Sequence, residues 1–557
     1  MGRTSIDRPW RRGGRAAYAV DRVRRMLRPP VVVSPAPATM RIDHDVEIEV
    51  RDGTILRANV HRPPGDGPVP VILSAHPYGK DGVPERRGRR YRLNMQFRML
   101  RQPSPVHLSD ATSWEAPDPA HWTSLGYAVV NLDVRGAGRS NGVGDLLSDL
   151  EARDIHDVIE WIAAQPWCDG GVAMMGVSYL AISQYKAAAT RPPHLRAIVP
   201  WEGFTDAYRD LFHPGGVREL GFSTMWTTLT RRTTRMHDDV GRENAHRPLD
   251  DDWWRALVPD LGAIEVPMLV CGSFSDNDLH TRGSFRAFAR TGSAERHLYT
   301  HRSGKWAAFY GADARAAQES FLDRHLRGGD TPPLPVVRLE VRESRDVVHA
   351  VRAEAEWPLA RTVWTTLQLD PERGLVSDAA TAGAVRFSTR RDAASFSFVF
   401  AEDTEITGPA ELTVHVRVDG ADDASLFVGL SKWRGGAFVP FEGSYGFGRD
   451  LVTTGWQSVA LRGPAPTIDP HVPEHDFRRR LPVRGRTGEL TVALGPSATF
   501  FRAGEELRLH VGGRQLSPRN PLFGAFPGIY RGSPRARVTI LTGPEHPSRL
   551  TLPVIPR

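Results

Sequence analysis

The chain has 557 residues, of which 40% are hydrophobic and 25% are charged, and it carries a formal net charge of +7. One hydrophobic core rarely supports this length, so we expect about two to four structural units. Lysine is rare among the 72 basic residues, and the arginines alternate with acidic residues along the chain. This pattern indicates solvated surfaces with local ion pairs and argues against a nucleic-acid partner.

Residues 1–38 read as a basic N-terminal extension. Its longest apolar stretch, residues 16–20, is shorter than a signal-peptide core of about 7 to 15 residues. Residues 11–28 could form a basic helix at a membrane surface, but we favour an extension that packs on the body. No segment reaches the roughly 18 apolar residues of a membrane span. Cys168 and Cys271 lack metal or redox spacing, which favours free thiols and a cytoplasmic location.

From residue 39 to about 330, strand-like and helix-like segments alternate, which predicts a mostly parallel sheet covered by helices. Asp52-Gly53 predicts a hairpin between the first two strands. Helices are expected over residues 150–162 and 181–189 and around Phe285. The expected strands are residues 46–50, 55–60, 69–75, 128–132, 172–175, 197–200, 268–271 and 297–299.

Two insertions interrupt this pattern, residues 79–122 and 204–262. Both would leave the carboxyl edge of the sheet, where ligands bind in doubly wound folds. The second contains Trp226, Trp253 and Trp254, which a merely solvated loop would not need. We therefore expect 39–203 and 263–330 to form the core and 204–262 a helical cap over the site. The alternative is that the insertions only extend the surface.

Beyond residue 331 the pattern changes to short alternating strands separated by Gly, Asp and Pro turns. The sequence therefore predicts a jelly-roll-like β-sandwich over residues 331–557, preceded by a proline-containing linker. Its expected strands are residues 362–369, 394–400, 412–418, 425–430, 489–494, 507–511 and 536–541.

Ser178 is the candidate nucleophile, because it lies where a predicted strand meets a predicted helix. A sharp turn there exposes the hydroxyl at the positive end of the helix, where backbone N–H groups can bind an oxyanion. Gly176 precedes it by two positions as this turn requires, but Leu180 replaces the second glycine of the common pattern. Ser140 is a weaker candidate, since the next residues read as a turn.

A serine nucleophile needs a histidine base and a carboxylate that orients the base. Asp276 follows one predicted strand and His301 follows the next, which gives the chain order serine, aspartate, histidine. Asp278 is the less favoured acid because it lies farther from its strand. Two groupings of acids and histidines, residues 43–45 and 237–246, match no known metal spacing, so we expect neither metal nor organic cofactor.

The sequence motifs resemble those of the cocaine esterase and X-prolyl dipeptidyl peptidase group of serine hydrolases, the CocE/NonD family. The similarity covers nearly the whole chain after residue 40. It is carried by HPYGK at residues 76–80, DVRG at 133–136, WCDG at 167–170, GVSYL at 176–180, SD at 275–276, EITGPA at 405–410 and FRAG at 501–504. The resemblance implies an α/β-hydrolase, followed by the sandwich, that cleaves an ester or amide through an acyl-enzyme.

The resemblance also implies roles for individual residues. Ser178 would attack the acyl carbonyl, His301 would carry the proton, and Asp276 would orient the imidazole. The phenol of Tyr78 and the backbone N–H of Tyr179 would form the oxyanion hole. Members of the group often self-associate through the sandwich, so a homo-oligomer is possible, and the sequence leaves the oligomeric state open.

Three alternatives stay open at this point. The family histidine aligns near Gly304, so His280 or His297 would serve if His301 does not. The activity could be release of X-Pro dipeptides, with Glu202 or Asp206 holding the amino terminus of a peptide substrate. A catalytically silent protein that binds a partner through the sandwich is the alternative of another class.

Overall fold

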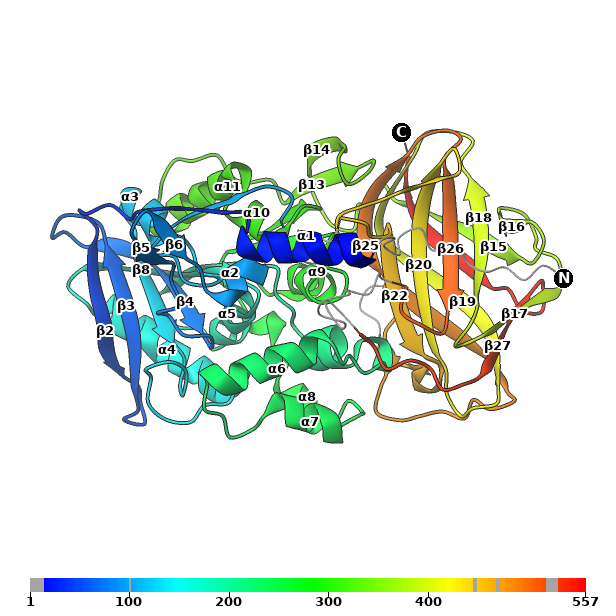
Figure 1. The fold of residues 1–557 in the computed structure, drawn as a ribbon, viewed down its shortest axis with the longest axis horizontal. Helices are drawn as coiled ribbons and strands as arrows, with labels where there is room; N and C mark the ends of the chain where they lie inside the picture. The colour runs from blue at the N-terminus through cyan, green and yellow to red at the C-terminus, as the bar shows by residue number, and fades with distance from the viewer. Residues whose placement is uncertain (1–14, 100–101, 444–447, 467–470, 517–528, 557) are drawn as a thin grey trace.

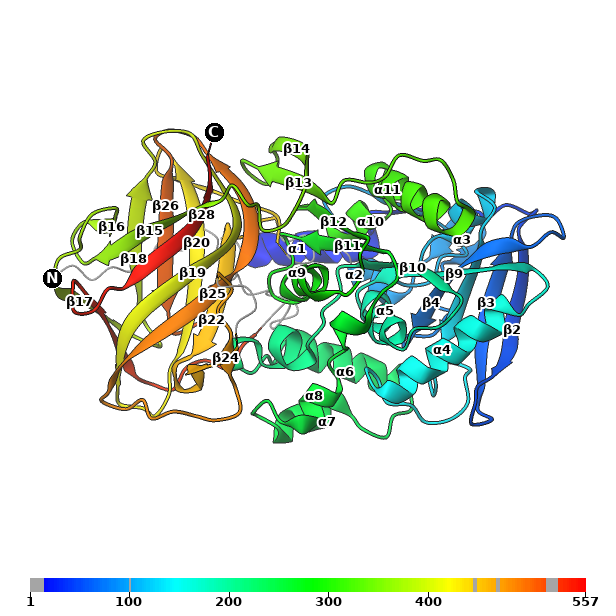
Figure 2. The same cartoon turned by 180° about the vertical axis from the view of Figure 1, so that it is seen from behind.

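The computed structural model describes residues 15–99, 102–443, 448–466, 471–516 and 529–556 (Figure 1). An α/β body, coloured blue to green, lies beside an all-β body, coloured yellow to red (Figures 1 and 2). Of the predicted N-terminal extension, residues 1–14 lie outside the described part. Residues after them form helix α1 (Arg15–Leu27), which lies on one broad face of the molecule near helix α2 (Met95–Met99).

The α/β body contains one large sheet, whose longest strand is β9, near its centre, with 10 residues. Neighbouring strands are parallel from β8 to β13, whereas β2, β3 and β14 are antiparallel to their neighbours. In spatial order the strands are β2 (Arg41–Glu49), β3 (Ile55–Arg62), β8 (Ala128–Asp133), β4 (Val69–His76), β9 (Cys168–Val177), β10 (Leu195–Trp201), β11 (Met268–Ser273), β12 (Arg296–His301), β13 (Val337–Arg342) and β14 (Val348–Glu354). The predicted entry hairpin and parallel sheet are confirmed.

Helices cover both faces of this sheet, and the alternation along β4 shows how. Val71 and Leu73 point into a core with helices α4, α5 and α9, whereas Ile72 points into a core with α3, α10 and α11. A strand covered on both faces is buried at successive positions and is mainly apolar, as β4 is from Pro70 to His76, where Ser74 and His76 are the polar exceptions. The helices are α3 (Pro119–Ser124), α4 (Asp149–Ala163), α5 (Tyr179–Ala189), α9 (Thr281–Arg290), α10 (Lys305–Phe309) and α11 (Ala312–Leu322), which continues into a π-helical turn (Asp323–Arg327).

The two predicted insertions have different structures. Residues 79–122 contain the hairpin β5 (Glu85–Arg87) and β6 (Arg90–Arg92), helices α2 and α3, and β7 (Val106–Ser109), which pairs with β1 (Val31–Ser34). Residues 204–262 are helical, as expected of a cap. They form a π-helical turn (Ala207–Phe212), 3-10 turns (Pro214–Gly216, Leu261–Ala263), and helices α6 (Phe222–Thr233), α7 (Val240–His246) and α8 (Asp252–Ala256).

The C-terminal body is a sandwich of two antiparallel sheets around one apolar core. One sheet contains β16 (Gly374–Val376), β15 (Val363–Asp370), β28 (Arg549–Ile555), β19 (Thr404–Asp419), β25 (Thr487–Phe501), β27 (Arg537–Thr542) and β17 (Gly383–Ser388). The other contains β18 (Ala393–Val399), β26 (Glu506–Gly512), β20 (Ser425–Arg434), β21 (Ala437–Val439) and β22 (Thr453–Ser458). A short pair, β23 (Gly463–Pro464) and β24 (His475–Asp476), stands apart. The predicted all-β sandwich is confirmed.

No helix among the described residues is long and apolar enough to cross a membrane.

Arg302, directly after β12, joins the two bodies. Its side chain is 0% exposed and donates to the backbone carbonyl of Leu451 and to Ser497 Oγ at 3.4 Å. The guanidinium also lies 4.3 Å from the centre of the Phe441 ring. Burial lowers the pKa of Arg302 to about 10, which leaves the group charged at neutral pH. The sandwich therefore packs against the carboxyl end of β12.

Replacing Arg302 should weaken the contact between the α/β body and the sandwich. Arg302→Ala leaves the buried Leu451 carbonyl without its donor, which costs about 1 to 3 kcal/mol. We expect a thermal midpoint lower by a few degrees, measured by calorimetry. Arg196→Ala, which removes an exposed arginine of β10, is the control and should leave the midpoint unchanged. An Arg302→Ala protein that unfolds at the wild-type temperature would contradict this role.

Candidate active site

Ser178 lies at the sharp bend between β9 and α5. Its backbone has φ 58° and ψ −116°, a conformation that L-residues rarely adopt. Two hydrogen bonds fix the bend: Ser178 N–H donates to the Trp201 carbonyl at 3.0 Å, and Val177 N–H donates to the Glu115 carbonyl at 3.0 Å. The Ser178 side chain does not cap the helix, so its hydroxyl is available for other partners. The predicted strand, turn and helix are all present.

The bend also explains the departure from the two-glycine pattern. A Cβ at Gly176 would lie 2.4 Å from the Cβ of Leu180, so only glycine fits there. The second close approach is made by Gly203 after β10, where a Cβ would lie 2.9 Å from the Cβ of Ala181. The glycine that lets the helix pack closely is therefore supplied by another strand, and Leu180 is free to be large.

The structure brings Ser178 and Asp276 together through His280. His280 Nε2 lies 3.2 Å from Ser178 Oγ, and His280 Nδ1 lies 2.6 Å from Asp276 Oδ2. All three side chains are buried. An ionised Asp276 accepts the proton on Nδ1, so Nε2 is left as the acceptor that faces the serine hydroxyl. The loop after β11 makes this possible, because the backbone N–H groups of Leu279 and His280 both donate to the Asp276 carbonyl in a tight turn.

His301, the histidine that the sequence favoured, has other partners. The Ser303 backbone N–H donates to its Nδ1 at 3.1 Å, so Nδ1 carries no proton. Its Nε2 therefore carries the proton and donates to Glu202 Oε1 at 3.1 Å. Both ring nitrogens are thus engaged with groups other than Ser178 and Asp276. Glu202 itself is 0% exposed, and one of its two carboxylate oxygens is engaged by His301.

The remaining acidic and histidine candidates lie elsewhere. Asp206 accepts from the backbone N–H of Arg209 at the start of a π-helical turn. His297 Nδ1 faces the carbonyl of Pro335, outside the group around Ser178. Asp278 is next to the sandwich, where Tyr530 donates to its backbone carbonyl at 3.4 Å.

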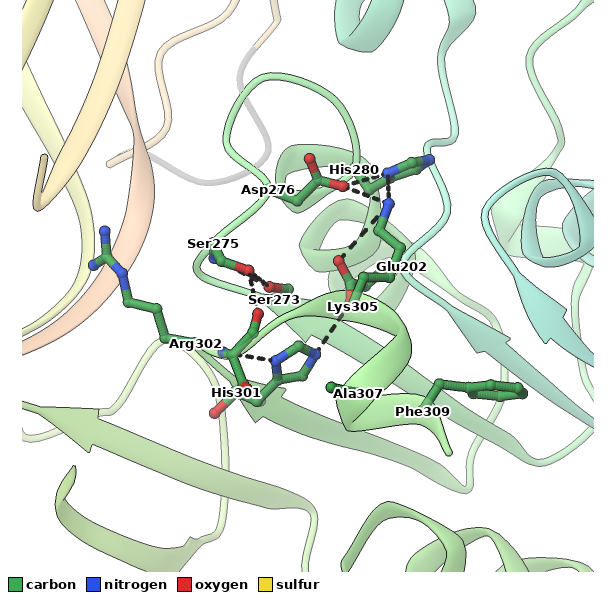
Figure 3. Close-up of polar contacts among 12 residues, drawn as sticks. Glu202, Ser273, Ser275, Asp276, His280, His301, Arg302, Lys305, Ala307 and Phe309 are labelled. Carbon is green, nitrogen blue, oxygen red and sulfur yellow. Dashed lines mark hydrogen bonds and ion pairs between the residues drawn. The ribbon is translucent and has the colours of Figure 1, made fainter. Parts of the chain in front are cut away.

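Lys305, the first residue of α10, contacts both Asp276 and His280 (Figure 3). Its Nζ lies 2.7 Å from Asp276 Oδ2, 2.8 Å from His280 Nδ1 and 4.0 Å from Glu202 Oε2. Burial disfavours the charged carboxyl, but Lys305 and His280 more than offset it and hold the pKa of Asp276 well below its ordinary value. Burial and the ammonium of Lys305 together lower the pKa of His280, against the opposing effect of Asp276.

Tyr78 and Tyr179, the two residues that the sequence assigned to an oxyanion hole, lie next to each other, with ring centres 6.2 Å apart. The cap residue Trp226 donates from Nε1 to the Tyr78 hydroxyl at 3.0 Å, which leaves the phenol proton to be donated elsewhere. Burial raises the pKa of Tyr78 well above its ordinary value, so the phenol stays protonated. Tyr179 begins α5, and the helix supplies no acceptor for its backbone N–H. Its phenol donates to Glu151 at 2.7 Å and anchors the first turn.

Glu115, from the first insertion, was not singled out from the sequence. It is 3% exposed, and its backbone carbonyl accepts from the Val177 N–H next to Ser178. Burial is the main cause that raises the pKa of Glu115 to about 8, and Lys305 and the Ser178 hydroxyl oppose it only in part. The carboxyl is therefore neutral at pH 7. The sequence has no motif that would predict a role for Glu115, since it follows a buried tryptophan in an irregular segment.

Glu202, Cys271 and His301 have potential ligand atoms within 4.8 Å of one another. They do not fit a metal ion. His301 has both nitrogens in hydrogen bonds, burial raises the pKa of the Cys271 thiol well above its ordinary value, and Lys305 places a positive charge beside Glu202. The three groups read as part of the buried polar network behind the catalytic candidates.

Two family models match the chain. Residues 52–304 match the X-Pro dipeptidyl-peptidase (S15 family) model, and residues 330–551 match that of the X-Pro dipeptidyl-peptidase C-terminal non-catalytic domain. The first segment contains strands β3 to β12 of the large sheet and the bend at Ser178, and the second contains β13, β14 and nearly all of the sandwich.

Individual relatives agree with these models. The solved structure of a CocE/NonD family hydrolase from Staphylococcus aureus is 31% identical, with a TM-score of 0.87 and coverage of 93% of this chain and 94% of that one. Cocaine esterase of Rhodococcus sp. (strain MB1 Bresler) is 30% identical over 387 residues, covering 58% of this chain. That match spans 62% of the esterase, less than two thirds of its length. An α-amino acid ester hydrolase structure, 18% identical with coverage of 94% and 98%, shares the fold with a TM-score of 0.70.

The protonation of Glu115 can be tested directly. Its carboxyl should lose its proton as the pH rises through about 8, with loss of a protonated-carboxyl band in difference infrared spectra. In the unfolded chain Glu115 releases this proton near its ordinary pKa of 4.5. The free energy of unfolding should therefore fall as the pH rises from 4.5 toward 8.

Glu115→Gln should abolish the infrared transition near pH 8. Glu151→Gln is the matched control, because burial raises the pKa of Glu151 to about 7, and that variant should keep the Glu115 transition. A transition near pH 8 that survives Glu115→Gln would show that another group is responsible.

Proposed function

Because this chain belongs to the CocE/NonD family of hydrolases, we propose that it cleaves an acyl ester or amide through a covalent acyl-enzyme on Ser178. The observation that carries the proposal is the series of contacts from Ser178 Oγ to His280 Nε2 and from His280 Nδ1 to Asp276, at 3.2 and 2.6 Å. A nucleophile, a base and an orienting carboxylate are the minimum that acyl transfer on serine requires.

In the proposed reaction, His280 takes the proton of Ser178 at Nε2 as the oxygen attacks the acyl carbonyl. Asp276 keeps the Nδ1 proton in place and stabilises the imidazolium. The carbonyl oxygen, now negative, receives hydrogen bonds from the Tyr78 phenol and the Tyr179 backbone N–H, each worth about 3 kcal/mol. His280 then protonates the leaving group, and in the second half it activates the water that hydrolyses the acyl-enzyme.

His280 takes the place that the sequence gave to His301 because of the contacts that each ring makes. Asp276 and His280 are four residues apart across a tight turn, so acid and base come from one loop. His301 is proposed to support Lys305 and Glu202 instead. We also propose a small-molecule or peptide acyl substrate, and a cytoplasmic location in keeping with the two buried free thiols.

Substitution of the two histidines distinguishes the assignments. We expect Ser178→Ala to abolish labelling by a fluorophosphonate probe and hydrolysis of a p-nitrophenyl ester. His280→Ala should lower kcat/KM for the ester by about a thousandfold, because the serine loses its base. His301→Gln, which keeps a donor toward Glu202, should stay within about tenfold of wild type. The reverse order of the two histidine variants would return the base to His301.

The other candidate functions are separated by the same proteins. Stoichiometric labelling of wild type contradicts a silent binding protein, whereas a folded wild type that takes no label supports it. Release of X-Pro dipeptides is tested with X-Pro anilides beside acyl esters and acyl amides. Since Glu202 is engaged with His301, we expect esters without a free amino group to be cleaved at least as well as X-Pro anilides.

A further inference from the structure

Lys305 touches both the proposed orienting acid and the proposed base, yet the reaction described above gives it no task. Figure 3 shows its side chain reaching the point where Asp276 and His280 meet, with Glu202 and His301 behind it. The distances from Nζ are 2.7 Å to Asp276 Oδ2 and 2.8 Å to His280 Nδ1. Lys305 is itself buried. A buried ammonium at this place requires a reason, because taking its charge out of water costs several kcal/mol.

The hydrogen-bond inventory limits what Lys305 can do here. An ammonium only donates, and Nδ1 of His280 also donates while Asp276 is ionised. Lys305 and His280 are therefore two donors that share one acceptor, Asp276 Oδ2. The 2.8 Å between Nζ and Nδ1 is therefore a close approach of two donors, and a carboxylate that turned away from the imidazole would lose two hydrogen bonds at Oδ2.

The charge of Lys305 is balanced from behind. Glu202 lies 4.0 Å from Nζ, and its other oxygen accepts from His301 Nε2 at 3.1 Å. Burial disfavours the charged amine, but Asp276 and Glu202 more than offset this and raise the pKa of Lys305. The Lys305–Glu202 pair adds no net charge, so the site keeps the single negative charge of Asp276 that an imidazolium needs beside it.

We propose that Lys305 is a positioning residue, whose ammonium clamps the Asp276 carboxylate against Nδ1 of His280 and is neutralised by the Glu202–His301 pair behind it. This inference rests on the proposed serine hydrolase activity. Lys305 acts through Asp276 and His280 and has no assigned contact with substrate.

The clamp has an electrostatic signature. The charged or titratable groups that face His280 are Asp276 on its own loop, Lys305 on α10, Glu202 after β10 and, beyond Ser178, Glu115. Burial is the main cause that lowers the pKa of His280, and Lys305 lowers it further, whereas Asp276 and Glu202 raise it. Activity needs a neutral His280, so removing Lys305 should raise the pKa of His280 and shift the acid limb of the pH profile to higher pH. Removing the charge of Glu202 should shift the same limb to lower pH.

The experiment measures kcat/KM for a p-nitrophenyl ester and the rate of fluorophosphonate labelling over about pH 5 to 9, using the full chain. Lys305→Met should shift the acid limb of the pH profile to higher pH by about one pH unit, which is a tenfold loss of rate on the acid side. Glu202→Gln should shift the acid limb to lower pH. Lys305→Arg, which keeps the charge, should restore the limb toward wild type.

The matched control is Lys432→Met. Lys432 is a 0%-exposed lysine in the sandwich, 2.8 Å from Glu505, so its loss removes a comparable buried ammonium far from Ser178. It should lower the thermal midpoint and leave the acid limb unchanged. If Lys305→Met does not fold, Glu202→Gln still tests the sign of the shift.

The outcomes separate the two proposals. A wild type without labelling or ester cleavage that depends on Ser178 overturns the hydrolase itself. An active wild type whose acid limb is unmoved by Lys305→Met or Glu202→Gln overturns the clamp alone. Complete loss of labelling in Lys305→Met even at high pH, with wild-type folding, would make Lys305 the base and also overturn the positioning role.

Discussion

The site depends on the positive φ of Ser178, because this one backbone conformation turns the chain from strand to helix and leaves the hydroxyl uncapped. Such a conformation costs of order 1 to 3 kcal/mol and persists only where the surroundings over-determine it. Here hydrogen bonds from the bend to Trp201 and Glu115 hold it, and Gly176 and Gly203 provide the space. The sheet and the first insertion therefore stabilise a bend that neither would form alone.

Much of the fold could be predicted because its strands are long apolar runs at the expected spacing, and each predicted strand of the α/β body lies on an observed one. Ser178 and Asp276 follow from the same reasoning, since both lie at strand ends. The partner of Asp276 could not be chosen this way. His301 also lies at a strand end, and only the turn after β11 and the Ser303 N–H decide which imidazole meets the serine.

A local signal did exist for His280. An acid and a histidine four residues apart can meet across one turn of helix-like backbone, and Asp276 and His280 have this spacing. Strand-end placement favours His301 and local spacing favours His280, and the loop needs only a turn to bring the Asp276 and His280 side chains together. For Glu115 and Lys305 the sequence holds no comparable pattern, because each reaches the site from a segment whose path is set by tertiary packing.

The two bodies meet around the same loop, which links stability to the site. Asn277 follows the proposed orienting acid and lies so near β25 that a Cβ at Gly495 would come within 2.5 Å of its side-chain oxygen. Arg302 follows His301 and is buried against the sandwich. Movement of the sandwich would therefore be transmitted to the loop that holds Asp276 and His280. On this argument the sandwich is a structural support of the reaction, and its loss would disorder the base before it affected the bend at Ser178.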